Sequence, residues 1–175
     1  MRDLNNRMYS LISETIQKGI LPNQKVEGNL AYTVDPVYGI IRNRVNAECV
    51  KTLIRINGLR GSEYTDHIEK LLNWLLDKQN SDGSWNEVHV NYNHPSALIT
   101  SIVGEALVDG YLLLKNERLK MAAFQARENS LPLIMAGLTM NSKRGTIEPD
   151  NNFPDLFMTS EVLQNLELWI LQTNL

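Results

Sequence analysis

Two histidines lie close together in a polar segment of the sequence. His89 and His94 flank Asn91, Tyr92 and Asn93. Imidazole titrates near neutral pH and binds zinc, so the pair could act as acid and base or as two metal ligands. A complete zinc site needs three or four ligands, and the spacing of the pair matches no Cys/His zinc signature. We therefore expect no metal or other cofactor, with His94 in catalysis and His89 and Tyr92 in substrate binding.

Carboxylates form the second group of candidate residues. Asp35 lies in an early polar segment, and Glu148 and Asp150 lie in a late one. A carboxylic acid that faces an apolar cavity can have a raised pKa and donate a proton to a substrate. On this hypothesis Glu148 and Asp150 are catalytic, and Asp35 binds substrate. The alternative is that the two late residues are ordinary solvated loop carboxylates.

A third pair of carboxylates is unexpected, because it lies in a strongly apolar stretch. Glu105 and Asp109 are one helical turn apart and share a side of the predicted helix, where like charges repel. Either the pair is exposed at an edge, or one member is protonated or paired with an arginine. The sequence leaves these alternatives open.

Composition limits the class of protein. The chain has 175 residues, 43% hydrophobic, with a net charge of -3, which predicts one domain over residues 1–175 and no nucleic-acid partner. Cys49 is the single cysteine and cannot form an internal disulfide, and the N-terminus lacks the apolar core of a signal peptide, so we expect a cytoplasmic protein. Polar residues interrupt the longest apolar stretch, 97–114, which predicts a buried helix rather than a membrane span.

Apolar residues at helical spacing predict an all-α fold of six helices. Their expected ranges are about 3–18, 46–58, 63–79, 96–112, 117–140 and 160–170. Pro132 should kink or break the fifth helix. The third helix has one apolar face and should lie outside, whereas the fourth is apolar nearly all round and should lie inside. Long connections that contain Gly28, Gly83 and Gly145 divide the helices into three hairpins, with a repeat of about sixty residues.

The turn after the third helix is the best-defined local signal. Residues 80–83 are four turn-formers, and Gly83 can take the positive φ that often closes a helix. Trp85 is expected to pack against the end of that helix, with Gln79 bonded to its free carbonyls. Ser96 is expected to begin the fourth helix.

The segment from Trp74 to Trp85, with Gln79, Asp82-Gly83 and Trp85 in order, resembles the Gln-Trp motif of the squalene-hopene cyclase and protein prenyltransferase superfamily. The resemblance implies an α/α toroid, in which inner helices surround a central cavity and loops at one end form its mouth. About six hairpins make a full toroid, so three hairpins imply a partial one.

That resemblance implies a terpenoid-cyclase-like protein that binds a hydrophobic or polyene-like small molecule, with Trp85 in substrate binding and an acid-initiated cyclisation as the possible isomerase reaction. The family's Asp-x-Asp-Asp acid motif is absent from the sequence. The alternative function is a non-catalytic interaction or ligand-binding subunit. Because three hairpins leave the apolar faces of the terminal helices unpaired, we also expect a homodimer or a partner subunit.

Overall fold

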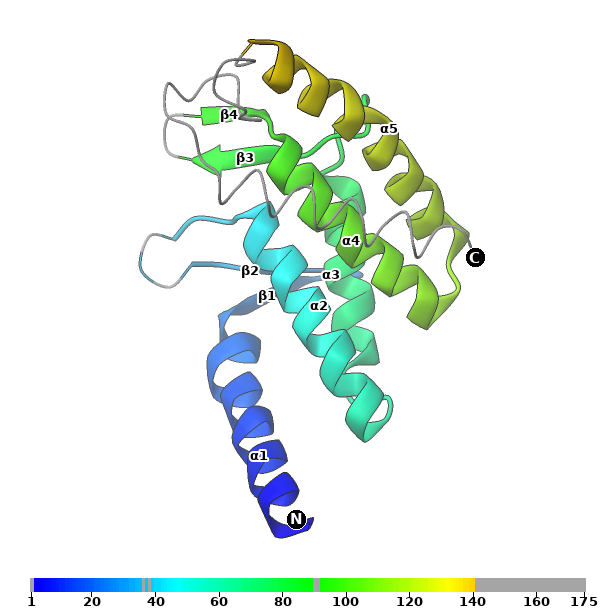
Figure 1. Ribbon diagram of the computed structural model, residues 1–175. Coiled ribbons are helices and arrows are strands. Elements are labelled where there is room, and N and C mark those ends of the chain that lie inside the picture. Colours follow the sequence, from blue (N-terminus) through cyan, green and yellow to red (C-terminus); the bar gives the residue numbers. More distant parts are fainter. Residues whose placement is uncertain (1, 36, 38, 90–91, 141–175) are drawn as a thin grey trace.

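The computed structural model describes residues 2–35, 37, 39–89 and 92–140 of the chain (Figure 1). This part is mostly helical, as predicted. The α-helices are α1 (Arg2–Thr15), α2 (Asn43–Arg60), α3 (Thr65–Asp77), α4 (Ala97–Leu114) and α5 (Glu117–Met140). A π-helical turn at Ile16–Ile20 and a 3-10 turn at Leu21–Asn23 extend α1. The sixth predicted helix and Gly145 lie outside the described residues.

The prediction of a purely helical fold needs one correction, because both long connections contain β-structure. Strands β1 (Gln24–Glu27) and β2 (Leu30–Thr33) pair antiparallel, and so do β3 (Asn86–His89) and β4 (Tyr92–Pro95). Each two-stranded hairpin links one helix to the next (Figure 1). A two-stranded hairpin is marginal alone in water, so the neighbouring helices must hold each one in place.

The end of α2 and the interior of α5 also differ from the prediction. Helix α2 runs past Gly58 and ends at Arg60, where Gly61, with a φ of 94°, caps the helix. An interior glycine costs only about 1 kcal/mol relative to alanine, which the packing of α2 overcomes. Helix α5 continues through Pro132, so the break expected there does not occur. Ser96 begins α4 as predicted, and its hydroxyl accepts a hydrogen bond from the Ile99 N–H.

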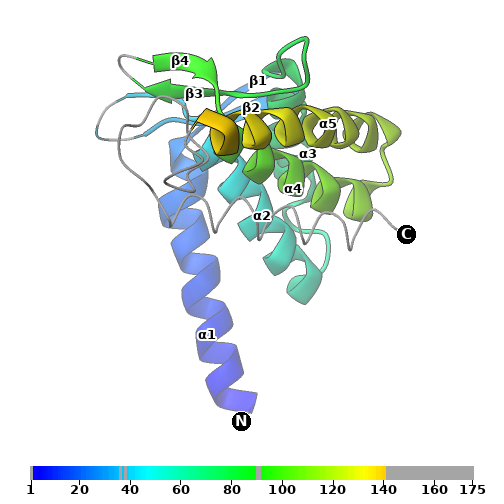
Figure 2. The same cartoon turned by 45° about the horizontal axis from the view of Figure 1, so that its top comes forward.

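Helix α4 is central to the helix packing. Helix α4 packs against α2 and α5, and α3 packs against α2 and α4. Figures 1 and 2 show α2 and α4 side by side, with α1 extending away from the rest. The buried residues of α3 lie on one side of the helix, and residues 98–108 of α4 are all buried. The predicted contrast between an amphipathic third helix and an enclosed fourth helix is therefore confirmed.

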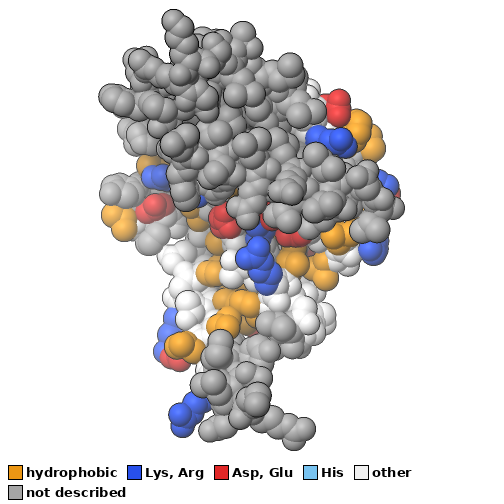
Figure 3. Space-filling model, in the orientation of Figure 1, with side chains coloured by type: hydrophobic (Ala, Val, Ile, Leu, Met, Phe, Trp, Pro, Cys, Tyr) orange, Lys and Arg blue, Asp and Glu red, His pale blue; other side chains and the backbone are white. Residues whose placement is uncertain are grey.

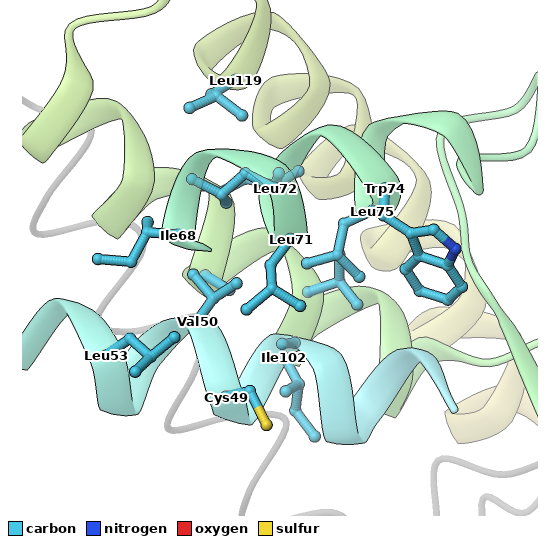
Figure 4. Close-up of a cluster of buried hydrophobic side chains, with 14 of the residues drawn as sticks. Cys49, Val50, Leu53, Ile68, Leu71, Leu72, Trp74, Leu75, Ile102 and Leu119 are labelled. Carbon is cyan, nitrogen blue, oxygen red and sulfur yellow. The ribbon is translucent and has the colours of Figure 1, made fainter. Parts of the chain in front are cut away.

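The core lies where α2, α3 and α4 meet. Figure 4 shows Val50 and Leu53 of α2 beside Ile68 and Leu71 of α3, and all four side chains are fully buried. Helices α3 and α4 approach each other closely at Gly110, where an added Cβ would lie 2.6 Å from Leu72 Cδ1. No helix in the described part of the chain combines the length and the apolar character needed to cross a bilayer.

The described residues contain two helix–hairpin–helix units, α1-β1-β2-α2 and α3-β3-β4-α4. The fourth residue of the second helix accepts a backbone N–H in both units, from the last residue of β2 in the first unit and from the residue before β3 in the second. Asn46 Oδ1 accepts from Thr33 N at 2.7 Å, and Thr100 Oγ1 accepts from Trp85 N at 3.0 Å. The acceptors occupy the same position in their helices, whereas the donors lie at different ends of the two hairpins, so the two units share their element order but not this contact in full.

The register of that repeat differs from the predicted one. Gly28 lies in the turn between β1 and β2, whereas Gly83 precedes β3. These two glycines are therefore not structurally equivalent, although both have positive φ angles, 62° and 90°. Glycine is common in many kinds of turn. The sequence repeat, which was aligned on its glycines, therefore placed two different turns at the same position.

Candidate functional site

The turn before β3 is fixed by Trp85, as its sequence predicts. The indole is fully buried, and its Nε1 donates to the Leu75 carbonyl at 2.8 Å. The backbone N–H donates to Thr100 on α4. Trp85 therefore joins the end of α3 to the start of α4. The indole therefore has a structural role in this turn, and the substrate-binding role expected for Trp85 stays a prediction.

Gln79 connects the same turn to α5. Its Nε2 donates to the Gly83 carbonyl at 3.1 Å and to the Ala122 carbonyl of α5 at 3.0 Å. The expectation that Gln79 bonds to the carbonyls at the end of its own helix is not met, because these two acceptors lie on the turn and on α5. Gly83 adds a close approach, since a Cβ there would lie 2.7 Å from the Gln125 backbone oxygen.

The two units meet at the start of α2. Asn43 Nδ2 donates to the Asn86 carbonyl at the start of β3, at 2.9 Å. Asn80 Nδ2 donates to Asn86 Oδ1 at 2.8 Å, which ties the same residue to the turn after α3. Asn43 belongs to α2 of the first unit, and Asn86 belongs to β3 of the second unit. We call Arg42, Asn43 and Asn86 the junction site.

The junction site contains two buried polar atoms that lack hydrogen-bond partners within the described part of the chain. One is Arg42 Nε, a donor, and the other is Asn43 Oδ1, an acceptor on a side chain that is 5% exposed. Most buried polar groups in native proteins are paired. An unpaired donor and an unpaired acceptor on consecutive residues therefore require an explanation, and a bound ligand group could provide it.

The predicted residues of the middle loop come together in the β3-β4 hairpin. His89 pairs with Tyr92, and Glu87 pairs with His94 in the register of the two strands. Because residues alternate between the two faces of a strand, positions 87, 89, 92 and 94 share one face. Sequence reasoning named three of these residues and missed Glu87. Only the strand register shows that Glu87 belongs with them.

The other predicted site residues do not join this group in the described structure. Asp35 follows β2, and its Oδ1 accepts from the Val37 N–H at 2.9 Å. Its backbone bonds to Gly39 and Ile40, so the residue organises its own turn. Glu148 and Asp150 lie outside the described residues. Their expected position beside His94 stays a prediction.

A cluster of charged residues lies between α2 and α4. Lys51 Nζ donates to Glu105 Oε2 at 2.6 Å, with side chains only 10% and 7% exposed. Glu48 Oε2 lies 3.9 Å from the same ammonium group. Burial raises the pKa of Asp109, and the nearby Glu105 raises it further, although Lys51 and Arg55 act in the opposite direction.

This cluster resolves the alternatives left open for the two carboxylates of α4. Glu105 is paired, but with a lysine rather than an arginine. Asp109, half-buried, has a pKa shifted toward the protonated form. Glu105 is therefore buried and paired with Lys51, whereas Asp109 is half-buried with a raised pKa. The two carboxylates thus have different environments. Two carboxylates with different environments can serve different chemical roles.

A shallow depression of about 370 Å³ lies between the end of α3 and the start of α5. Leu76, Gln79, Arg118 and Met121 contribute to its wall. Met121 and the nearby Phe124 are more than half exposed. The depression is open, and no described polar group in it is left unpaired and buried, so it is a weaker candidate than the junction site.

On the face shown in Figure 3, acidic and basic described side chains are interspersed among apolar ones. No continuous basic stripe of the kind that binds a nucleic-acid backbone is visible among them. Where the structure describes side chains, no group of three His, Cys, Asp or Glu residues is placed to hold a metal ion. No protein-family model matches the sequence, and no curated protein matches it either.

Proposed function

We propose that the chain is a helical-hairpin protein of the α/α-toroid kind that binds a hydrophobic small molecule with a polar head group. The head group is recognised at the junction site. The observation that carries this proposal is the unpaired donor Arg42 Nε and the unpaired acceptor Asn43 Oδ1, both buried where the two units meet. The resemblance of residues 74–85 to the Gln-Trp motif supports the apolar nature of the rest of the ligand.

The energetic argument concerns the cost of leaving these atoms unpaired. A buried unsatisfied polar group costs about 1–3 kcal/mol. A ligand group that both accepts and donates, such as a hydroxyl or a carboxylic acid, would pair with Arg42 Nε and Asn43 Oδ1 and remove that cost. Asn43 is held in place for this purpose by its bond to the Asn86 carbonyl. The site is thus prepared before the ligand arrives.

The test compares a prenyl alcohol, farnesol, with its hydrocarbon counterpart, farnesene, by calorimetric titration of the full chain. Two hydrogen bonds at about 0.5–1.5 kcal/mol each predict a roughly 5- to 150-fold preference for the alcohol. Arg42→Lys keeps the charge but removes Nε, and should reduce that preference. Arg118→Lys, at an exposed arginine of the depression on α5, is the matched control and should leave it unchanged. Equal affinity of the alcohol and the hydrocarbon for the unaltered protein would contradict the proposal.

A second candidate function is proton donation to a bound polyene, as the cyclase resemblance implies. The observation that favours it is Asp109, whose pKa is raised beside the buried Lys51–Glu105 pair. A carboxyl with a raised pKa is the form that a general acid needs near neutral pH. The test is incubation with squalene and a search for a product of unchanged mass and altered chromatographic retention. Asp109→Asn should remove that product, and a product made equally well by this variant would exclude Asp109 as the acid.

A further inference from the structure

The β1-β2 hairpin has one covered edge and one exposed edge. On the covered edge, the last residue of β2, Thr33, donates its backbone N–H to Asn46 of α2. On the other edge, three of the four residues of β1 are exposed, among them Val26 at 52%. An exposed strand edge can pair with a further strand. The outer edge of β1 is therefore a candidate interaction surface on the side of the hairpin away from α2.

Hydrogen bonds at the base of the hairpin show how its ladder alternates. Val34 N–H donates to the Asn23 carbonyl at 3.0 Å, so this pair is bonded across the hairpin. In the next pair, the N–H groups of Gln24 and Thr33 donate instead to the Leu21 carbonyl and to α2, respectively. Bonded and non-bonded pairs alternate along an antiparallel ladder, so the pair after this one is bonded again.

This alternation fixes the next three residues of β1. Lys25 and Glu27 bond to β2 through their backbones, whereas Val26 turns its N–H and C=O away from β2. Because Val26 is exposed, these two groups can bond to another strand. Lys25 and Glu27 are exposed as well, and they place opposite charges on either side of Val26.

We propose that the outer edge of β1 pairs antiparallel with the same edge of a second copy of the chain, about a twofold axis at Val26. A twofold axis makes such a contact self-complementary. Val26 exchanges two backbone hydrogen bonds with Val26 of the second copy, and the two hairpins form one four-stranded sheet. A sheet of three or more strands is more stable than a single hairpin, so both hairpins gain from the contact.

The charges beside Val26 favour this partner and this register. With the axis at Val26, Lys25 of each copy is opposite Glu27 of the other, which gives two attractive pairs. An axis at Lys25 would place two lysines opposite each other, and an axis at Glu27 would do the same with two glutamates. Like charges in directly opposite positions are destabilising. The run Lys25-Val26-Glu27 thus specifies one antiparallel register of two identical strands.

The interface is small, because the strand ends before Gly28, whose φ of 62° belongs to the turn. We therefore expect a weak dimer that forms at high micromolar protein concentration. It differs from a dimer through the terminal helices, which the sequence led us to expect, because it uses β1. It is also independent of the ligand proposed for the junction site, which lies on α2 and β3.

Sedimentation equilibrium of the full chain over a range of concentrations measures the dimer. The mass should rise from 19.9 kDa toward twice that value. Lys25→Glu and Glu27→Lys each turn two attractive pairs into repulsive ones, so each should weaken dimerisation by about fivefold or more. The double variant Lys25→Glu, Glu27→Lys exchanges the charges and should dimerise like the unaltered chain.

A mixture of the two single variants is the sharpest test, because each repels itself and complements the other. The mixture should form heterodimers at concentrations where neither variant associates alone. Lys120→Glu is the matched control, since it changes the net charge equally at an exposed lysine of α5, and it should dimerise normally. Glu27→Lys also loses the hydrogen bond that Tyr32 donates to Glu27, so circular dichroism checks that each variant is folded.

Amide hydrogen exchange locates the interface. The Val26 N–H should exchange more slowly as protein concentration rises, whereas those of Lys25 and Glu27, which already bond to β2, should change little. Val26→Pro removes the outward N–H without removing a bond to β2, and proline is tolerated on an edge strand where the N–H would face solvent. This variant should stay folded and monomeric.

Three outcomes would overturn the proposal. One is an unaltered chain that keeps the monomer mass up to near-millimolar concentration. Another is a dimer that persists in folded Lys25→Glu and Val26→Pro variants, which would place the contact on a different surface. The last is a mixture of the two charge variants that does not associate, which would exclude the antiparallel register. All these measurements are made without the hydrophobic ligand, so the two proposals can fail separately.

Discussion

The close approach of the turn after α3 to helix α5 can be measured with two glycine substitutions. Gly83 and Gly28 both have positive φ angles, 90° and 62°. An added Cβ at Gly83 would lie 2.7 Å from the Gln125 backbone oxygen, whereas one at Gly28 would meet no atom within 4 Å. The two alanine variants therefore share a backbone penalty and differ in steric overlap.

The expected magnitudes follow from these two contributions. A left-handed conformation costs an L-residue about 1–2 kcal/mol, and alanine recovers about 0.4–1 kcal/mol by restricting the unfolded chain. Gly28→Ala should therefore destabilise the protein by about 0–1.6 kcal/mol. Overpacking adds about 1–3 kcal/mol at Gly83. The upper part of that range is expected, because the obstructing atom belongs to the backbone of a helix and cannot rotate away.

Urea denaturation followed by circular dichroism measures the difference. Gly83→Ala should unfold at a lower urea midpoint than Gly28→Ala, with the slope m unchanged. Gln125→Ala should not rescue Gly83→Ala, because the nearest atom is a backbone oxygen that every residue carries. Equal midpoints for the two glycine variants would show that the turn does not lie against α5 and would refute the reasoning.

Three further predictions concern buried groups. Trp85→Ala should destabilise the protein by about 3–5 kcal/mol in the same denaturation assay, and an unchanged midpoint would contradict the buried indole. Lys51→Met alone should cost about 3–5 kcal/mol because it leaves Glu105 buried and unpaired, whereas Lys51→Met with Glu105→Leu should be nearly neutral; similar losses in both would contradict this. The raised pKa of Asp109 favours the protonated folded state, so its contribution to stability is present below the unfolded value of 3.8 and decreases as pH rises through the folded pKa. Asp109→Asn should therefore raise the urea midpoint at pH 7 but not at pH 3, and a gain independent of pH would rule out this titration.

The helices were predictable because their burial follows a simple pattern. Leu71, Leu72 and Leu75 repeat on one side of α3, and α4 is apolar nearly all round, so each pattern fixes both the element and its surroundings. Ser96 and Gly83 mark the ends through well-understood capping and turn chemistry. These are local signals, and local signals are what a sequence displays directly.

The β-hairpins were missed because their strands are short and largely polar. The strand Gln24–Glu27 has one apolar residue in four, too few to show the alternation that indicates a strand. One signal was present, since the pair Gly28-Asn29 between two short runs is typical of a tight hairpin turn. The sequence between the two strands of the second hairpin, Val90-Asn91, contains no glycine and is not a typical pair for a tight hairpin turn.

The contacts that define the candidate sites could not be predicted, because they join residues far apart in the chain. Lys51 and Glu105 are 54 positions apart, and Asn43 is 43 positions from Asn86. Which cation meets Glu105 depends on the packing of α2 against α4. For this reason the sequence alone could not show whether Glu105 and Asp109 are exposed, protonated or paired. The packing of α2 against α4 shows the environment of each.

The same contacts explain how the two short β-hairpins, which carry several candidate site residues, are attached to the helical core. The end of β2 is bound to Asn46 on the first turn of α2, and the residue before β3, Trp85, is bound to Thr100 on the first turn of α4. Asn43 then links the first of these helix ends to the second hairpin. Polar strands that could not fold alone are thus positioned by helix ends buried in the core. Side chains on such strands can change without loss of the fold, which is how a rigid scaffold accommodates binding residues on its connections.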